Sequence, residues 1–106
     1  MNANAVQITI YPTEENIREG REGTFDCRAR AHDGTTYPEV RWTRQGAPLP
    51  ASAYETDGRL TFTSASPYDS GTYVCSTTYG GRNYEAYAQL NVLPCKFYPG
   101  SSLFPN

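Results

Sequence analysis

The fold of this chain is decided by the stretch Asp69-Ser70-Gly71-Thr72-Tyr73-Val74-Cys75. A polar turn with a glycine leads into a run in which Tyr73 and Cys75 fall on one face of a β-strand, because strand side chains alternate between faces. Tyr73 precedes Cys75 by two residues, a position from which its phenol can hydrogen-bond back to the turn at Asp69. The stretch therefore predicts a core strand that begins behind a compact, hydrogen-bonded turn.

Two residues earlier in the sequence, Cys27 and Trp42, complete a spacing pattern with Cys75. Cys27 lies 48 positions before Cys75, and Trp42 lies 15 positions after Cys27. Apolar and polar residues alternate around both, so Cys27 shares a face with Phe25, and Trp42 shares one with Val40. Core-facing Cys, Trp and Cys predict an immunoglobulin sandwich, in which a disulfide joins two sheets and the indole packs on it.

A disulfide between Cys27 and Cys75 would stabilise the domain by about 4 kcal/mol in the chain-entropy model, because it closes a long loop. Such a bond forms in an oxidising compartment. The alternative is a reduced pair of buried thiols, as in intracellular sarcomeric immunoglobulin modules.

The remaining strands follow from the same alternation. We expect an edge strand from Val6 that ends at Tyr11-Pro12, and a second edge segment at residues 17–20 that switches sheets. A strand through Leu60 and Phe62 and a final strand over residues 86–92 follow, the latter after a hairpin loop at residues 80–83. The predicted fold is an all-β, two-sheet antiparallel immunoglobulin-like sandwich over residues 6–93. Residues 1–5 are expected to be a linker or an addition to an excised module, and residues 94–106 a linker or tail.

Length and composition exclude several classes of protein. The 106 residues fit one domain, with 38% hydrophobic and 19% charged residues. A net charge of −2 argues against a nucleic-acid-binding surface, and no apolar stretch approaches the roughly 20 residues that would insert into a membrane. The single His32 stands beside Asp33 in a polar loop without a second ligand, so we expect no metal, no cofactor and no catalytic residues.

Several segments of the sequence resemble the intermediate-set immunoglobulin modules of perlecan-type basement-membrane heparan sulfate proteoglycans. They include residues 21–29, residues 37–44 with Trp42-Thr43-Arg44, the Pro48-Leu49-Pro50 word and residues 69–75, within a match over about residues 6–92. The resemblance implies a secreted basement-membrane protein made of tandem repeats. It stops at the tail, where the third cysteine, Cys95, could pair with a neighbouring module, link two chains or remain free.

A partner-binding surface is predicted on the later strands. The exposed face of the sheet that contains Trp42 should show Arg41, Thr43, Val74, Ser76, Thr78, Tyr87 and Gln89. The adjoining hairpin gathers Tyr79, Arg82 and Tyr84, and tyrosine and arginine are enriched at interface hot spots. Alternatively, Tyr84 and Tyr87 occupy cross-strand pairs that only stiffen the hairpin.

Other motifs carry less weight. A stripe of arginines could bind sulfated glycans such as heparin. Its members would be Arg18, Arg21, Arg28, Arg30, Arg41 and Arg44. Acidic residues interleave with them, so heparin is the less favoured ligand. Ser70-Gly71 could suit glycosaminoglycan attachment, but it belongs to the turn before Tyr73. The sequence contains no N-glycosylation acceptor.

Two functions from different classes remain. The first is a non-enzymatic extracellular module that mediates protein–protein interaction and spacing in a basement-membrane proteoglycan, with laminin, nidogen, collagen or a receptor as partner. The second is the ligand-binding ectodomain of a cell-surface adhesion or signalling receptor.

Overall fold

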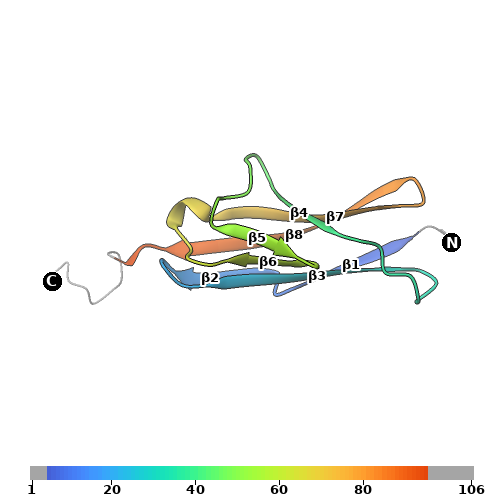
Figure 1. Ribbon diagram of the computed structural model, residues 1–106, viewed down its shortest axis with the longest axis horizontal. Coiled ribbons are helices and arrows are strands. Elements are labelled where there is room, and N and C mark those ends of the chain that lie inside the picture. The colour runs from blue at the N-terminus through green and yellow to red at the C-terminus, as the bar shows by residue number, and fades with distance from the viewer. Residues whose placement is uncertain (1–4, 96–106) are drawn as a thin grey trace.

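The computed structural model describes residues 5–95, so most of the predicted linker segments, residues 1–5 and 94–106, lies outside the described residues. Two four-stranded sheets lie face to face (Figure 1). The first sheet has the order β1-β3-β6-β5 and contains β1 (Val6–Tyr11), β3 (Gly23–Ala31), β5 (Ala53–Thr56) and β6 (Arg59–Phe62). The second has the order β2-β8-β7-β4 and contains β2 (Glu14–Arg18), β4 (Arg41–Arg44), β7 (Gly71–Tyr79) and β8 (Arg82–Leu93). The predicted two-sheet sandwich is confirmed.

The chain changes sheets between β1 and β2, as predicted. β1 ends at Tyr11, the Tyr11–Pro12 peptide bond is cis, and β2 joins the second sheet. No reversing turn separates the two strands, so β2 runs parallel to β8 while every other strand pair is antiparallel. The antiparallel prediction therefore holds for all strand pairs except this one.

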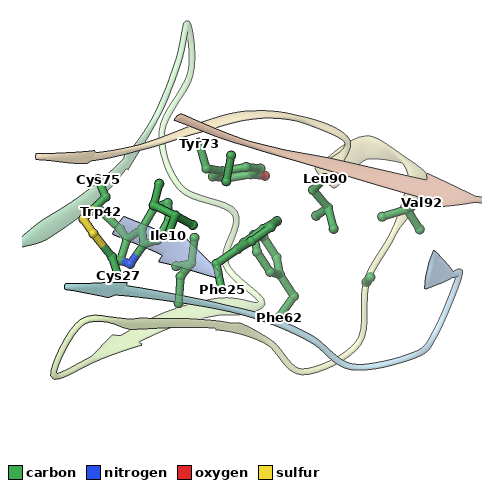
Figure 2. Close-up of a cluster of buried hydrophobic side chains, with 12 residues drawn as sticks. Ile10, Phe25, Cys27, Trp42, Phe62, Tyr73, Cys75, Leu90 and Val92 are labelled. Atoms are coloured by element: carbon green, nitrogen blue, oxygen red, sulfur yellow. A yellow bond between two sulfur atoms is a disulfide. The ribbon is translucent and has the colours of Figure 1, made fainter. Parts of the chain in front are cut away.

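The core lies between the sheets and is aromatic at its centre (Figure 2). Phe62 forms edge-to-face contacts with both Tyr73 and Phe25, at ring-centroid distances of 5.1 and 6.4 Å. Phe25 also packs against Trp42 at 5.9 Å. Aromatic pairs in such geometries add stability beyond the area they bury, so the inward faces of β3, β4, β6 and β7 hold the two sheets together.

Two elements were not expected. β5 pairs with β6 over four residues, but its side chains are all at least partly exposed, so its sequence shows no alternation. A short 3-10 helix, η1 (Pro67–Asp69), lies within the predicted turn before β7, and Ser66 caps it. The helix brings Asp69 to the start of the core strand.

The connection from β7 to β8 is tighter than the predicted loop at residues 80–83. Gly80 and Gly81 form a two-residue turn with φ values of 60° and 77°, a conformation that glycine adopts without strain. Tyr79 therefore pairs directly with Arg82, and Arg82 and Asn83 belong to β8 rather than to a loop.

Candidate partner-binding surfaces

The predicted disulfide between the two sheets is present. Cys27 and Cys75 form a disulfide, and the indole of Trp42 lies beside it (Figure 2). Trp42 is buried, and its Nε1 donates a hydrogen bond to the Gly58 carbonyl at 3.0 Å. The disulfide and the indole thus link β3, β4 and β7 to the turn between β5 and β6.

Tyr73 forms a tyrosine corner. Its hydroxyl donates to the Asp69 carbonyl at 2.6 Å, and burial raises the pKa of the Tyr73 phenol to about 12. The Asp69 carboxylate accepts a hydrogen bond from the Ser66 backbone N–H, which caps η1. These bonds hold η1 rigidly against the start of β7.

Arg44 is part of the same structural region and is not free to bind a ligand. Its Nη2 donates to the carbonyls of Tyr68 and Ser70 at 2.8 and 2.9 Å, and its guanidinium lies 5.5 Å from the centre of the Tyr73 ring. The guanidinium therefore ties β4 to the turn before β7.

The predicted partner-binding residues divide between two faces. Tyr79, Arg82 and Tyr84 share one face of residues 77–84, here called the hairpin arm, because Tyr79 pairs with Arg82 and Thr77 pairs with Tyr84. By the same alternation, these side chains continue the core-facing side of the sheet beyond the core. The other predicted residues, Arg41, Thr43 and Tyr87, lie on the outer face of the second sheet.

The hairpin arm extends past its neighbouring strands. β4 pairs with β7 only as far as Ser76, and β2 pairs with β8 only from Gln89 onward. Both backbone edges of the arm therefore lack a neighbouring strand, and Figure 1 shows the arm projecting at one end of the sandwich. Arg82 is exposed, while Tyr79 and Tyr84 are half-buried.

One residue of the predicted outer face is not exposed. Val74 retains 8% exposure although it points away from the core. Its register partners on the flanking strands are Thr43 and Tyr87, whose side chains share its face and cover it. The prediction that Val74 is exposed is therefore wrong.

Much of this outer face is already hydrogen-bonded within the domain. Gln89 accepts from the Thr72 hydroxyl and donates to Asn91, and Asn91 donates to Glu14 and Asn16. A separate bond joins the Tyr87 hydroxyl to the Glu85 carboxylate at 2.9 Å, which raises the pKa of the Tyr87 phenol. Tyr84 and Tyr87 do occupy cross-strand positions, opposite Thr77 and Val74 respectively.

The arginines of the predicted glycan-binding stripe do not gather on one face. Arg28 and Arg30 point outward from β3 in the first sheet, and Arg41 points outward from β4 in the second. Arg18 ends β2, and Arg21 lies in the turn that follows. Because the two sheets face opposite directions, no continuous basic stripe forms.

Asp33 has a local structural role. Its carboxylate accepts hydrogen bonds from the backbone N–H groups of Thr35 and Thr36 and from the Thr36 hydroxyl, and these bonds lower the pKa of Asp33 to about 2. Residues 5–95 contain no cluster of side chains that could hold a metal ion and no helix long and apolar enough to cross a membrane.

Cys95 is exposed and forms no disulfide within the described part of the chain. Its backbone N–H donates to the Glu19 carboxylate at 3.3 Å, and its Sγ lies 3.6 Å from the Glu19 carbonyl oxygen. The Glu19 N–H in turn donates to the Leu93 carbonyl. The turn after β2 therefore binds the segment that follows β8.

The disulfide, the buried indole and the tyrosine corner define an immunoglobulin-type sandwich. A family model described as "Immunoglobulin domain" matches residues 7–78, and the chain belongs to this family. Domains of this family are typically structural or interaction modules.

Two basement-membrane proteoglycans are similar to the chain in sequence. The chain is 49% identical over 88 residues to the basement membrane proteoglycan of Caenorhabditis elegans. The aligned region covers 83% of this chain and 3% of that protein. It is 31% identical to the mouse basement membrane-specific heparan sulfate proteoglycan core protein, with 76% and 2% covered. The predicted resemblance to proteoglycan modules is confirmed.

Adhesion proteins and a solved structure also match. The chicken neuronal-glial cell adhesion molecule is 32% identical, with 82% of this chain and 7% of that protein covered. The structure of tandem immunoglobulin repeats of Dlar superposes with a TM-score of 0.70 at 20% identity, covering 88% of this chain and 50% of that one. The chain thus spans 7% or less of the length of these proteoglycan and adhesion proteins and half of the length of the Dlar structure.

Proposed function

We propose that this domain is a non-enzymatic, extracellular module of a basement-membrane proteoglycan, in which it mediates protein–protein interaction and spacing. The observation that carries the proposal is the 49% identity to the nematode basement membrane proteoglycan over most of the chain. The disulfide between Cys27 and Cys75 supports a secreted location, because such bonds persist in oxidising compartments.

The spacing role is supported by the direction of the chain. β1 starts at one end of the sandwich and β8 finishes at the other, so successive modules could follow one another along a line (Figure 1). In this proposal the domain comprises residues 6–93, with connecting segments on either side. The bonds from Glu19 to Leu93 at the end of β8 and to Cys95 just beyond it would stiffen the connection to a following module.

The binding role is assigned to the hairpin arm. Tyr79, Arg82 and Tyr84 offer two aromatic rings and a guanidinium on one face of a projecting ribbon, a composition typical of interface hot spots. Arg41, Thr43 and Tyr87 form a second candidate surface, but the Tyr87 hydroxyl and the amides beside it already have partners within the domain. The partner is a matrix or cell-surface protein such as laminin, nidogen, collagen or a receptor.

The test is binding of the immobilised domain to laminin, nidogen, collagen IV and heparin at physiological salt. We expect saturable binding to a matrix protein that Arg82→Ala or Tyr84→Ala weakens by about 30-fold, the loss typical of a hot-spot residue. Arg21→Ala and Tyr68→Ala are matched controls, because both residues are exposed and belong to the turn after β2 and to η1, two segments at the opposite end of the sandwich (Figure 1).

Three outcomes would contradict this assignment. Equal weakening by the control substitutions would show that binding does not depend on the arm. Saturable binding that neither arm substitution weakens would move the site to another face, and no binding to any of the four would leave only the spacing role.

A receptor ectodomain is the alternative, favoured by the 32% identity to the neuronal-glial cell adhesion molecule. Sequencing of the full-length transcript distinguishes the two. A transmembrane segment would support the receptor, whereas further immunoglobulin repeats with laminin-type modules would support the proteoglycan.

A further inference from the structure

A second surface lies on the outer face of the first sheet, away from the hairpin arm. β6 pairs with β3 only from Gly23 to Asp26, so the rest of β3 has a strand neighbour on one side only, β1. On the open side, the loop after β3 and the turn before β6 approach instead. The result is a groove, here called the first-sheet groove, whose lining includes Gln7, Thr9 and Tyr11 of β1, Arg28 and Arg30 of β3, and Tyr37 of the loop after β3.

The groove contains two arginines that no carboxylate of residues 5–95 pairs with. Arg28 lies opposite Thr9 and Arg30 lies opposite Gln7, so their direct neighbours on β1 are uncharged. Both arginines are exposed, and neither forms an ion pair with a carboxylate of residues 5–95. They therefore differ from Arg44, which is held by backbone carbonyls.

The acidic residues of the groove only partly offset this charge. Asp26 is bound by the Arg59 guanidinium, with Nε at 2.7 Å and Nη2 at 3.4 Å from its two oxygens. Asp57, in the turn before β6, is the other acid that lines the groove. Two free guanidinium groups thus face one free carboxylate on a protein whose overall charge is −2.

Aromatic rings flank the arginines. Tyr11 is 77% exposed and Tyr37 is 56% exposed, although both are large side chains with apolar ring faces. Rings in this position can pack on the backbone and aliphatic atoms of a bound chain, while guanidinium groups pair with its charges. Exposed tyrosines beside unpaired arginines are the composition of a binding surface.

The spacing of the two arginines indicates the shape of the ligand. Arg28 and Arg30 are two residues apart on one strand, so their Cα atoms are separated by roughly 6.6 Å. An extended polypeptide repeats its own side chains on one face at the same interval. Acidic residues at alternate positions of such a chain would place one carboxylate on each guanidinium.

We propose that the first-sheet groove binds an extended, acidic polypeptide segment with Asp or Glu at alternate positions. The inference goes beyond the proposed function, because it assigns a second surface that does not depend on the hairpin arm. A sulfated polysaccharide would use the same charges but has no reason to require the alternate spacing, so the two ligands can be distinguished.

The experiment measures fluorescence anisotropy of labelled 12-residue peptides at low and physiological salt. One peptide alternates Glu with Ser, a second carries the same number of Glu residues with none two positions apart, and a third has Gln in place of Glu. The expected result is binding of the first alone, weakened by added salt because exposed charge pairs are screened.

Substitutions then locate the site. Arg28→Gln and Arg30→Gln should each reduce affinity for the alternating peptide by about tenfold, the loss expected for one charge-assisted hydrogen-bonded pair. Arg21→Gln is the matched control, since it removes the same charge from an exposed position in another turn. Because all three side chains are exposed, the variants should fold, which thermal unfolding checks.

The proposal is overturned if both Glu peptides bind equally, if Arg28→Gln and Arg30→Gln bind as the unaltered domain does, or if no peptide binds. Binding of a heparin oligosaccharide that depends on Arg28 and Arg30, without peptide binding, would assign the groove to a polysaccharide instead. Arg82→Ala should leave peptide binding unchanged, so failure here is separable from failure of the arm.

Discussion

Replacement of Tyr73 by Phe tests the tyrosine corner most directly. Tyr73→Phe keeps the aromatic ring that contacts Phe62 at 5.1 Å and removes only the hydroxyl that donates to the Asp69 carbonyl. Tyr73 is fully buried, so water cannot replace the lost donor without rearrangement. The substitution therefore isolates one hydrogen bond.

The expected loss follows from that geometry. A buried carbonyl deprived of its partner costs about 1–3 kcal/mol, so we expect the free energy of unfolding to fall by about 2 kcal/mol at pH 7. In a domain of this size, each kcal/mol shifts Tm by roughly 4–8 °C. Tyr73→Phe should therefore lower Tm by about 8–16 °C.

The difference between the two proteins should shrink at alkaline pH. The folded state holds the Tyr73 proton with a pKa of about 12, whereas an unfolded tyrosine loses its proton near pH 10. Between these values the unfolded state binds fewer protons than the folded state, so the parent domain loses stability as pH rises. The loss at Tyr73 is about 1.4 kcal/mol by pH 11, and Tyr73→Phe does not have it.

Urea unfolding at pH 7, 9 and 11 measures both effects, with Cys95→Ser in every protein so that the free thiol cannot attack the disulfide. Tyr68→Phe is the control, because its side chain is 88% exposed. The reasoning is refuted if Tyr73→Phe is as stable as the parent at pH 7. A stability difference that stays constant up to pH 11 would refute the alkaline part.

Three further predictions concern stability. Replacing Cys27 and Cys75 together by Ala should cost about 4 kcal/mol of unfolding free energy, and a loss below 1 kcal/mol in urea unfolding would contradict the loop-closure reasoning. Gly58→Ala should be far more damaging than Gly20→Ala: both have φ of 87°, but a Cβ at Gly58 would lie 2.5 Å from a backbone oxygen, whereas one at Gly20 meets nothing; equal Tm shifts would refute this. Arg44→Met keeps the aliphatic stem but removes both hydrogen bonds to carbonyls, so thermal unfolding should show a loss of about 2 kcal/mol, and an unchanged Tm would count against it.

The core strands could be predicted from the sequence because their side chains alternate strictly. β3 shows this most clearly, with Phe25, Cys27 and Ala29 buried and Asp26 and Arg28 exposed between them. Alternation is a local property that one buried face imposes on each strand. The strands that contain Trp42 and Tyr73 could be predicted for the same reason.

β5 could not be predicted in this way. It lies at the edge of the first sheet, and its residues Ala53–Thr56 have no buried face that would produce alternation. It forms because β6 presents a free backbone edge on which it can pair. The prediction that Val74 is exposed was wrong for a related reason, since its burial depends on side chains of two neighbouring strands.

The sequence by itself determined the sandwich, the disulfide, the buried indole and the tyrosine corner, because each rests on local alternation and on the spacing of Cys27, Trp42 and Cys75. Only the tertiary structure decided which distant residues share a surface. It separated Arg28 and Arg30 from Arg41, brought Tyr37 beside β3, and left the hairpin arm without a neighbouring strand on either edge. These outcomes depend on strand order and on where each pairing ends, and both are set by contacts between segments far apart in the chain.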